Sequence, residues 1–198
     1  LWKLADIHDA RSAYQEMTNQ LLLSLKESAE KDQFYDYLTG TSGLIVLLLN
    51  MFDEREDERL LDVASRLGDH LVKRALKSEQ YWKWSSALVD KDTFLVGLGH
   101  GATGITLALF RLYLATGKDV YREAFEKSLA YEQSMYDERQ QNWIDPRKRD
   151  RLDSCADDTW CQGSIGIGIS RLAMLRLKED ARVRKDLRRA IDISLQTE

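Results

Sequence analysis

Hydrophobic residues recur along this chain at helical spacing, and in three segments they mark one face only: residues 57–77, 117–129 and 183–195. In the last segment Val183, Leu187 and Ile191 follow one another every four residues, with charged residues between them. One apolar face opposite a charged face is typical of a helix on the outside of a protein. The pattern therefore predicts three half-exposed outer helices.

Two other segments, residues 44–49 and 105–110, are apolar almost all round. A helix without a polar face has to be covered on every side, so we expect these to be inner helices lined by the outer ones. The β-branched pair Ile45 and Val46 leaves a strand open for the first segment. Its neighbours are helical, however, and the alternation of inner and outer helices predicts an all-α fold, an α/α toroid or double-layer helical barrel.

A Gly-x-x-Gly motif recurs at residues 40–43, 101–104 and 163–166, in steps of 61 and 62 residues, and each copy precedes an apolar run. A fixed period of this kind indicates one supersecondary unit, here a helical hairpin, that is repeated and stacked. The glycines have a structural interpretation, because they let an inner helix start close to its neighbours. We expect one domain over residues 1–198 with about three hairpins. It begins without Met and stops inside an amphipathic pattern, so we expect it to be truncated at both ends.

The connections at residues 78–97 and 140–160 are long and show no periodicity. Loops of this length are uncommon in compact domains and often functional. Both lead to the start of an inner helix, so we expect them at one rim of the toroid. They contain Trp82, Trp84 and Trp143, and Trp160 ends the second. These aromatic side chains could wall a cleft or pin the loops to the body, and the sequence leaves both open.

Composition narrows the classes of partner. With 31% charged residues, 43% hydrophobic residues and a single proline, the chain is typical of a helix-rich globular protein. A net charge of −4 gives no general attraction to nucleic acid, and the basic residues at 147–151 are interrupted by acidic ones, as in a solvated loop. No apolar stretch approaches the ~18 residues that a membrane span requires. We expect no nucleic acid partner, no membrane span and no signal peptide.

Two cysteines, Cys155 and Cys161, are too few for a disulfide framework. This usage is typical of an intracellular chain, and we expect a cytoplasmic location. The five residues between the two cysteines match no compact zinc motif. Cys155 is expected to be a buried or half-buried free thiol.

Three residues with chemical potential lie beside the glycine motifs. Asp36 is four residues before the first motif, His100 directly before the second and Cys161 two before the third. Equivalent positions of a repeat come together in space, so these residues could share one site. The start of a helix favours a thiolate, which binds metal or attacks, an imidazole moves protons near neutral pH, and a carboxylate can orient the imidazole.

Each of these residues also has a structural alternative. Asp36 could hydrogen-bond the backbone at the start of its helix, and His100 could be a structural histidine. His8 and His70 lie in helical stretches among charged residues, and we assign them no role.

Residues 98–105 (LGHGATGI) and 160–168 (WCQGSIGIG) resemble the signature segments of lanthionine synthetase C-like cyclases. The resemblance is closer to the cyclase domain of class II (LanM-type) lanthipeptide synthetases. Residues 35–43 (YDYLTGTSG) are similar to the first segment of the family. The resemblance spans most of the chain, in family order and spacing.

This resemblance implies a ring of inner and outer helices around one zinc ion, of which the chain would hold about half. It implies zinc-dependent addition of cysteine thiols of a precursor peptide to dehydroalanine or dehydrobutyrine, which forms thioether rings. Cys161 would be a zinc ligand, His100 the acid or base, and Asp36 its support. The remaining cysteine and histidine ligands are expected beyond residue 198, so the isolated segment would be inactive and bind less than one equivalent of zinc.

Two departures from the family accompany the resemblance. The chain has no Cys-His-Gly segment, and Gln162 stands where many LanM-type members carry histidine. Two other functions remain open. One is a non-catalytic scaffold that binds a peptide or thiol, and the other is a different toroid enzyme such as a glycoside hydrolase. The latter needs paired carboxylates, but Asp157 and Asp158 are adjacent and therefore point apart. An incomplete ring also exposes apolar helix faces, which predicts self-association.

Overall fold

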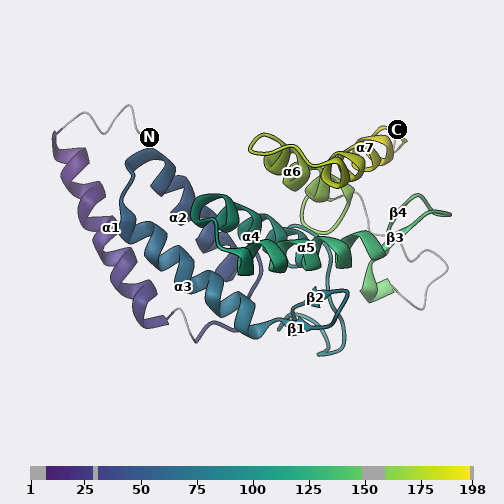
Figure 1. The fold of residues 1–198 in the computed structure, drawn as a ribbon, viewed down its shortest axis with the longest axis horizontal. Helices are drawn as coiled ribbons and strands as arrows, with labels where there is room; N and C mark the ends of the chain where they lie inside the picture. The colour runs from purple at the N-terminus through teal and green to yellow at the C-terminus, as the bar shows by residue number, and fades with distance from the viewer. Residues whose placement is uncertain (1–7, 29–30, 149–158, 197–198) are drawn as a thin grey trace.

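The computed structural model describes residues 8–28, 31–148 and 159–196, and helices dominate it (Figure 1). The helices in these ranges are, in chain order, α1 (His8–Ser28), α2 (Thr41–Arg55), α3 (Glu58–Arg74), α4 (Ala102–Thr116), α5 (Asp119–Ser134), α6 (Ser164–Leu175) and α7 (Ala181–Gln196). The predicted all-α fold is confirmed, and the strand alternative for residues 44–49 is excluded because these residues lie within α2.

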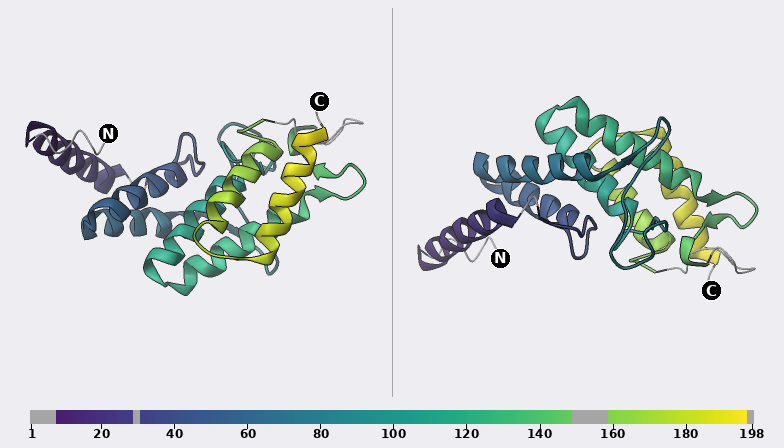
Figure 2. Two further views of the ribbon diagram at one scale, coloured as in Figure 1. Left: turned by 90° about the horizontal axis from the view of Figure 1, so that it is seen from above. Right: turned by 90° about the horizontal axis from the view of Figure 1, so that it is seen from below.

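Consecutive helices pair as three hairpins, α2 with α3, α4 with α5 and α6 with α7. The inner helices contact one another in order, α2 against α4 and α4 against α6, so the hairpins lie side by side (Figure 2). α1 packs against α3 at one end of this row. The two predicted layers of helices are therefore present in the described part of the chain.

The turns between paired helices follow from local sequence. α4 ends at Gly117, which has a φ of 68° and donates its N–H to the Tyr113 carbonyl, so a residue without a side chain is favoured there. α3 begins after Asp57, whose side chain accepts a hydrogen bond of 3.1 Å from Arg59 N. These signals confirm the helix ends expected near both positions.

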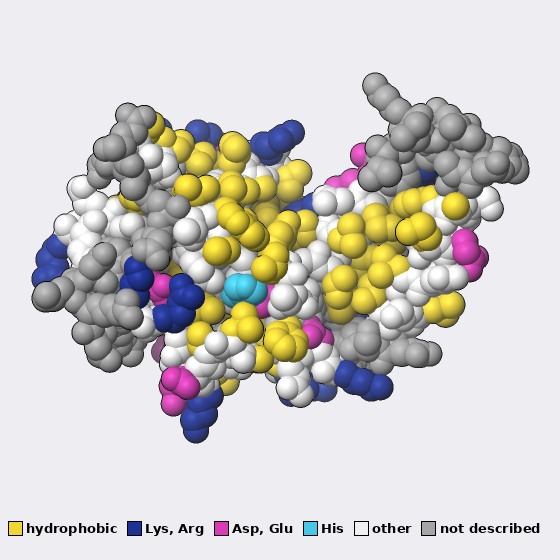
Figure 3. All heavy atoms as spheres, turned by 180° about the vertical axis from the view of Figure 1, so that it is seen from behind, with side chains coloured by type: hydrophobic (Ala, Val, Ile, Leu, Met, Phe, Trp, Pro, Cys, Tyr) yellow, Lys and Arg dark blue, Asp and Glu magenta, His cyan; other side chains and the backbone are white. Residues whose placement is uncertain are grey.

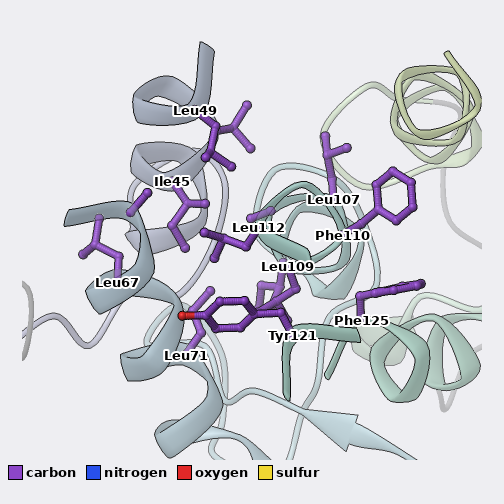
Figure 4. Close-up of a cluster of buried hydrophobic side chains, with 14 of the residues drawn as sticks. Ile45, Leu49, Leu67, Leu71, Leu107, Leu109, Phe110, Leu112, Tyr121 and Phe125 are labelled. Atoms are coloured by element: carbon purple, nitrogen blue, oxygen red, sulfur yellow. The ribbon is translucent and has the colours of Figure 1, made fainter. Parts of the chain in front are cut away.

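The main core lies where α2, α3, α4 and α5 meet (Figure 4). Tyr121 of α5 is fully buried between α3 and α4, and its hydroxyl lies 2.7 Å from Asp69 Oδ1. Burial, reinforced by the Asp69 carboxylate, raises the pKa of Tyr121. Gly68 of α3 leaves room for Leu112 and Tyr121 to pack against this helix, because an added methyl group would lie 2.4 Å from Leu112 Cδ1 and 3.1 Å from Tyr121 Cε1.

The inner helices differ in how completely they are covered, and residues 105–110 of α4 are all buried, as expected. Leu47 of α2 is 45% exposed, and α6 exposes Ile165, Ile169 and Leu172 in a stripe at helical spacing. The expectation of complete cover is wrong for residues 44–49, because α2, like α6, contacts one other inner helix in the described part of the chain. Hydrophobic side chains accordingly gather in several areas of the surface (Figure 3).

The long connections contain a repeated element that shows no sequence periodicity. Where each connection begins, two antiparallel strands of two residues each form a hairpin. The pairs are β1 (Leu76–Lys77) with β2 (Trp82–Lys83) and β3 (Tyr136–Asp137) with β4 (Asn142–Trp143). The two hairpins have the same register and lie 60 residues apart in sequence. A short 3₁₀ helix, η2 (Pro146–Lys148), follows the second. The repeat therefore includes helix, hairpin and loop.

The tryptophans mostly pin these connections to the body. Trp82, Trp84 and Trp143 are buried, and Trp84 Nε1 donates a hydrogen bond of 2.8 Å to the Leu71 carbonyl. Trp160, by contrast, is 49% exposed. Of the two alternatives left open by the sequence, anchoring therefore describes three of the four tryptophans, and one of them, Trp84, also lines a pocket.

Two expectations from the sequence concern the basic residues at 147–151 and the length and hydropathy of the helices. Arg147 of the basic loop forms a two-bond ion pair with Asp145, and Arg149 to Arg151 lie outside the described residues. Among the described helices, none combines the length and apolar character needed to cross a bilayer.

Candidate functional site

Each inner helix is preceded by a short loop that folds back against the helix, and we call these the lead-in loops: residues 34–40, 95–101 and 159–163. Equivalent backbone bonds close the first two, from Thr41 N to the Phe34 carbonyl and from Ala102 N to the Leu95 carbonyl, both 2.9 Å. The repeat seen in the sequence thus produces loops of the same shape at the same end of each inner helix.

The Gly-x-x-Gly motifs allow the close approach of loop and helix. A methyl group added at Gly43 would lie 2.1 Å from the Tyr37 carbonyl oxygen, and one at Gly166 would lie 1.9 Å from that of Trp160. These distances are far inside van der Waals contact, so only glycine fits. The structural interpretation of the motif is confirmed at both positions.

Backbone hydrogen bonds join the three lead-in loops to one another. Gly99 accepts bonds from Tyr37 N and Leu38 N, at 3.1 and 3.0 Å, and its own N–H donates to the Cys161 carbonyl at 2.8 Å. Gly97 allows the third loop to approach, because an added methyl group would lie 2.4 Å from the Cys161 carbonyl oxygen. The structure therefore brings the loops that carry Asp36, His100 and Cys161 together.

Asp36 and His100 contact each other directly. His100 Nδ1 lies 3.0 Å from Asp36 Oδ2, and the Asp36 side chain is only 5% exposed. The other oxygen, Oδ1, accepts hydrogen bonds from Thr39 N at 2.7 Å and from Thr39 Oγ1 at 3.0 Å. Asp36 thus bonds the backbone just before α2, at Thr39, whereas the first N–H of the helix, that of Thr41, donates to Asp32.

This geometry assigns the two ring nitrogens of His100 different tasks. A carboxylate beside Nδ1 holds the proton on that nitrogen and leaves Nε2 as an acceptor. The side chain of His100 is 21% exposed, so it remains accessible. The pair can therefore accept a proton at Nε2 while Asp36 stabilises the imidazolium that results.

A narrow pocket surrounds the pair. Its walls include Phe34, Tyr35, Trp84 and Ile105, together with Asp36 and His100. A wider and more open groove adjoins it, lined by residues 87–93, Pro146 and Arg147, and Ala87 lines both. The long connection after β2 thus leads from the surface towards His100.

Cys161 is half-buried, and its Sγ lies 3.7 Å from Thr159 Oγ1. Within the ranges that the structure describes, no three His, Cys, Asp or Glu side chains form a group able to hold a metal ion. A catalytic zinc normally has three protein ligands, so these residues do not by themselves fit a zinc site. Cys155, Asp157 and Asp158 lie outside the described residues.

Buried polar residues beneath the loops were not anticipated from the sequence. His70, which we assigned no role, is buried, and its Nε2 lies 2.9 Å from the Asp32 carbonyl oxygen. Asp32 Oδ2 in turn accepts a hydrogen bond of 2.9 Å from Thr41 N, so both residues hold the first lead-in loop. The periodic spacing of His70 with Leu67 and Leu71 was the signal available, because it places the ring on the buried face of α3.

A second unanticipated group consists of Glu132, Arg171 and Asp186, which are fully buried. Burial raises the pKa of Glu132 although Arg171 opposes this shift. Burial disfavours the charge of Arg171, but the two carboxylates hold the pKa of its guanidinium above the usual value. A lone arginine in the otherwise apolar and small-residue sequence of α6 was the signal available.

Stacked helical hairpins with polar side chains at the starts of the inner helices define an all-α repeat protein with one candidate site at the rim. The family model for lanthionine synthetase C-like protein matches residues 1–198. The chain therefore belongs to the lanthionine synthetase C-like family, which is associated with lanthionine synthetase activity and is generally zinc-binding. Among curated proteins none matches the chain.

Proposed function

We propose that this chain is part of a cyclase domain of the class II (LanM) type, which closes thioether rings in a lanthipeptide precursor. The observation that carries the proposal is the 3.0 Å contact between His100 Nδ1 and Asp36 Oδ2, in a chain that belongs to the lanthionine synthetase C-like family. Such a pair is suited to move one proton, which is what the addition of a thiol to an alkene requires.

The proposed reaction moves one proton from the substrate sulfur to the α-carbon while the sulfur bonds to the β-carbon. The substrate thiol gives its proton to His100 Nε2, and the sulfur bonds to the β-carbon of a dehydroalanine or dehydrobutyrine. The carbon–carbon π bond opens towards the carbonyl group to give an enolate. His100 then returns the proton to the α-carbon, so the side chain ends in its starting state.

Asp36 supports both proton transfers. Its Oδ2 fixes the imidazole and stabilises the positive charge that develops, while the two bonds from Thr39 hold the carboxylate in place. The open groove that adjoins the pocket at Ala87 is the proposed approach for the peptide.

Cys161 is the proposed contribution of this chain to a zinc site. The described residues supply no group of three ligands around it, so the proposed cysteine and histidine partners would lie outside these residues. When bound, zinc would favour the thiolate form of the substrate cysteine. The loop contact through Gly99 supports a location of that thiolate near His100.

A synthetic peptide with one cysteine and one dehydroalanine tests the proposal. Because the isolated segment is expected to be inactive, the assay uses the longer protein that contains the whole proposed domain, supplied with Zn²⁺, and mass spectrometry after alkylation of free thiols follows ring closure. We expect His100→Ala and Asp36→Asn to slow closure by about 10²–10⁴-fold. Asp62→Asn, which changes an exposed carboxylate on α3, is the matched control and should not alter the rate. Equal rates for all four proteins would overturn the proposal.

The second candidate is a non-catalytic scaffold that binds a peptide or thiol. The observation that favours it is that Cys161 belongs to no group of three metal-binding side chains among the described residues. A scaffold would bind the same peptide without consuming its thiol, and its affinity would not depend on the proton-accepting ability of His100. Peptide binding by calorimetry, measured beside the closure assay, separates the two functions.

A further inference from the structure

The fully buried group Glu132–Arg171–Asp186 joins three helices below the lead-in loops. Arg171 of α6 donates to Glu132 Oε2 of α5 at 2.5 Å and to Asp186 Oδ2 of α7 at 3.3 Å. Gln133 adds a bond of 3.1 Å to Asp186 Oδ2. Removing these charges from water is costly, so such a group is weak evidence for stability and invites a search for another purpose.

Thr103 connects this buried group to the loop that carries His100. Its hydroxyl oxygen lies 2.6 Å from Glu132 Oε2 and also 2.6 Å from the carbonyl oxygen of Val96, which belongs to the second lead-in loop. A hydroxyl has one hydrogen, and a carbonyl can only accept. When Thr103 donates to Val96, the carboxyl of Glu132 has to donate to Thr103.

The charges around Glu132 favour that arrangement. Glu132 shares the Arg171 guanidinium with Asp186, and the Arg189 guanidinium lies 4.0 Å from Asp186 Oδ1, so the second cation faces Asp186 and leaves the fully buried Glu132 only partly neutralised. Burial also raises the pKa of Glu132, which favours its protonated form. The carboxyl can then donate to Thr103 Oγ1, and the chain of hydrogen bonds from Glu132 to Val96 is complete.

The first lead-in loop has an equivalent closing bond but a different acidic partner, because Asp32 Oδ2 accepts a hydrogen bond from Thr41 N there. Ser42 Oγ donates to the Tyr35 carbonyl as Thr103 does to Val96, but no carboxylate contacts Ser42 within the described part of the chain. The buried group therefore serves the loop of His100 in particular. Thr103 is also bonded directly to α6, because Ser170 Oγ of α6 donates to the Thr103 carbonyl at 3.5 Å.

We infer that Thr103 and Glu132 are positioning residues: with Arg171 they fix the His100 loop relative to α6, before which Cys161 lies. The hydrogen bonds carry the positioning of the His100 loop. The link from this positioning to catalysis rests on the proposed function. Neither residue touches the substrate, and both act through the backbone of Val96.

Two isosteric substitutions on the same helix provide a matched test. Thr103→Val removes the hydroxyl that contacts both Glu132 and Val96. Thr106→Val removes the other hydroxyl on Glu132, which also lies 2.8 Å from Ser128 Oγ but contacts no lead-in loop. Both variants take one hydrogen bond from the same carboxyl, so we expect similar decreases in Tm.

The readouts are two NMR observables of the protein itself. One is the downfield imidazole N–H signal of His100 bonded to Asp36, assigned by its loss in Asp36→Asn. The other is amide hydrogen exchange at Gly99, whose N–H donates to Cys161. We expect Thr103→Val to broaden the first and to accelerate the second by roughly three- to tenfold, the value of one hydrogen bond. Thr106→Val should leave both unchanged.

Equal behaviour of the two variants, or no change at Gly99 in Thr103→Val, would overturn the inference. The ring-closure assay adds a separate result, since a positioning role predicts a lower kcat with little change in KM for Thr103→Val alone. If the NMR differences hold while no variant or parent closes a ring, the positioning of the loop stands and the proposed function fails.

Discussion

The backbone N–H of Gly99 donates a hydrogen bond of 2.8 Å to the carbonyl of Cys161, a residue from the next repeat. This bond places the third lead-in loop beside the second, where His100 contacts Asp36 of the first. The three loops thus contact one another through main-chain groups, and the side chains with chemical potential project from this shared framework.

Gly97→Ala tests the contact between the second and third lead-in loops. An added methyl group would lie 2.4 Å from both the Cys161 carbonyl oxygen and Gln162 Cα, and neither is a flexible side-chain end. We expect the free energy of unfolding to fall by about 1–3 kcal/mol, as for other overpacked sites. Urea unfolding measures this change.

Gly168→Ala is the control for that substitution. Its methyl group would lie 3.2 Å from Ala190 Cβ, inside a helix where alanine has the higher propensity. We expect a change within about 1 kcal/mol of zero. A loss for Gly168→Ala as large as that for Gly97→Ala would contradict the steric explanation.

Arg171→Met should be among the most destabilising substitutions in the chain. It leaves Glu132 and Asp186 buried without their shared cation, which costs about 3–5 kcal/mol. Replacing all three charges together, as Glu132→Gln, Arg171→Met and Asp186→Asn, should recover most of this loss. Chemical denaturation compares the two variants, and a triple variant no more stable than Arg171→Met would contradict the ion-pair explanation.

Glu132 predicts a particular dependence of stability on pH. Burial raises its pKa above the usual value of a glutamate in the folded state, so the folded protein binds this proton more tightly than the unfolded chain. The contribution is complete below pH 4.5 and is lost as the pH rises from there through the folded-state pKa. The stability of the wild type relative to Glu132→Gln should therefore fall with rising pH.

The measurement is urea unfolding from pH 4 upwards, and Glu123→Gln, an exposed position on the same helix, is the control. The stability of the wild type relative to Glu123→Gln should not fall with rising pH. A parallel pH profile for wild type and Glu132→Gln would mean that Glu132 does not retain its proton.

Zinc binding tests the proposed role of Cys161. A site without three ligands cannot hold the ion tightly, and the described residues contain no such group, so we expect the 198-residue chain to retain well under one equivalent after dialysis. Cys161→Ser should reduce even this amount. Elemental analysis gives the stoichiometry, and a full equivalent bound at nanomolar affinity would show that the chain contains a complete site.

The exposed stripe of α6 predicts self-association. Ile165, Ile169 and Leu172 present adjacent apolar side chains on one helix face, and a second copy of the chain would remove them from water. We expect the mean mass in light scattering to rise with protein concentration and Ile169→Glu to suppress the rise. A monomer at all concentrations would show that the stripe does not drive association.

The helices could be predicted because their signals are local. The apolar period of α3, α5 and α7 and the glycine at the end of α4 depend on neighbours within a few turns. The gathering of the lead-in loops could be expected from the repeat alone. The two-residue strands could not, because so short a pair has no alternation to detect.

The buried ion group lay beyond sequence reasoning for a different reason. Arg171 reaches a glutamate 39 positions earlier and an aspartate 15 positions later, and neither distance is a multiple of the repeat. Charged residues on a helix are normally solvated, so Glu132 and Asp186 could not be told from exposed acids. Only the packing of α5, α6 and α7 shows that all three are enclosed.

Because main-chain hydrogen bonds through Gly99 join all three lead-in loops, the framework does not rest on the side-chain contact between Asp36 and His100 alone. Evolution could exchange those amino acids for others and obtain new chemistry at the same rim without redesigning the scaffold. A combinatorial library randomised at the codons of Asp36, His100 and Cys161 should accordingly yield mostly folded members, and the glycines, rather than the reactive groups, would be the positions that tolerate no diversity.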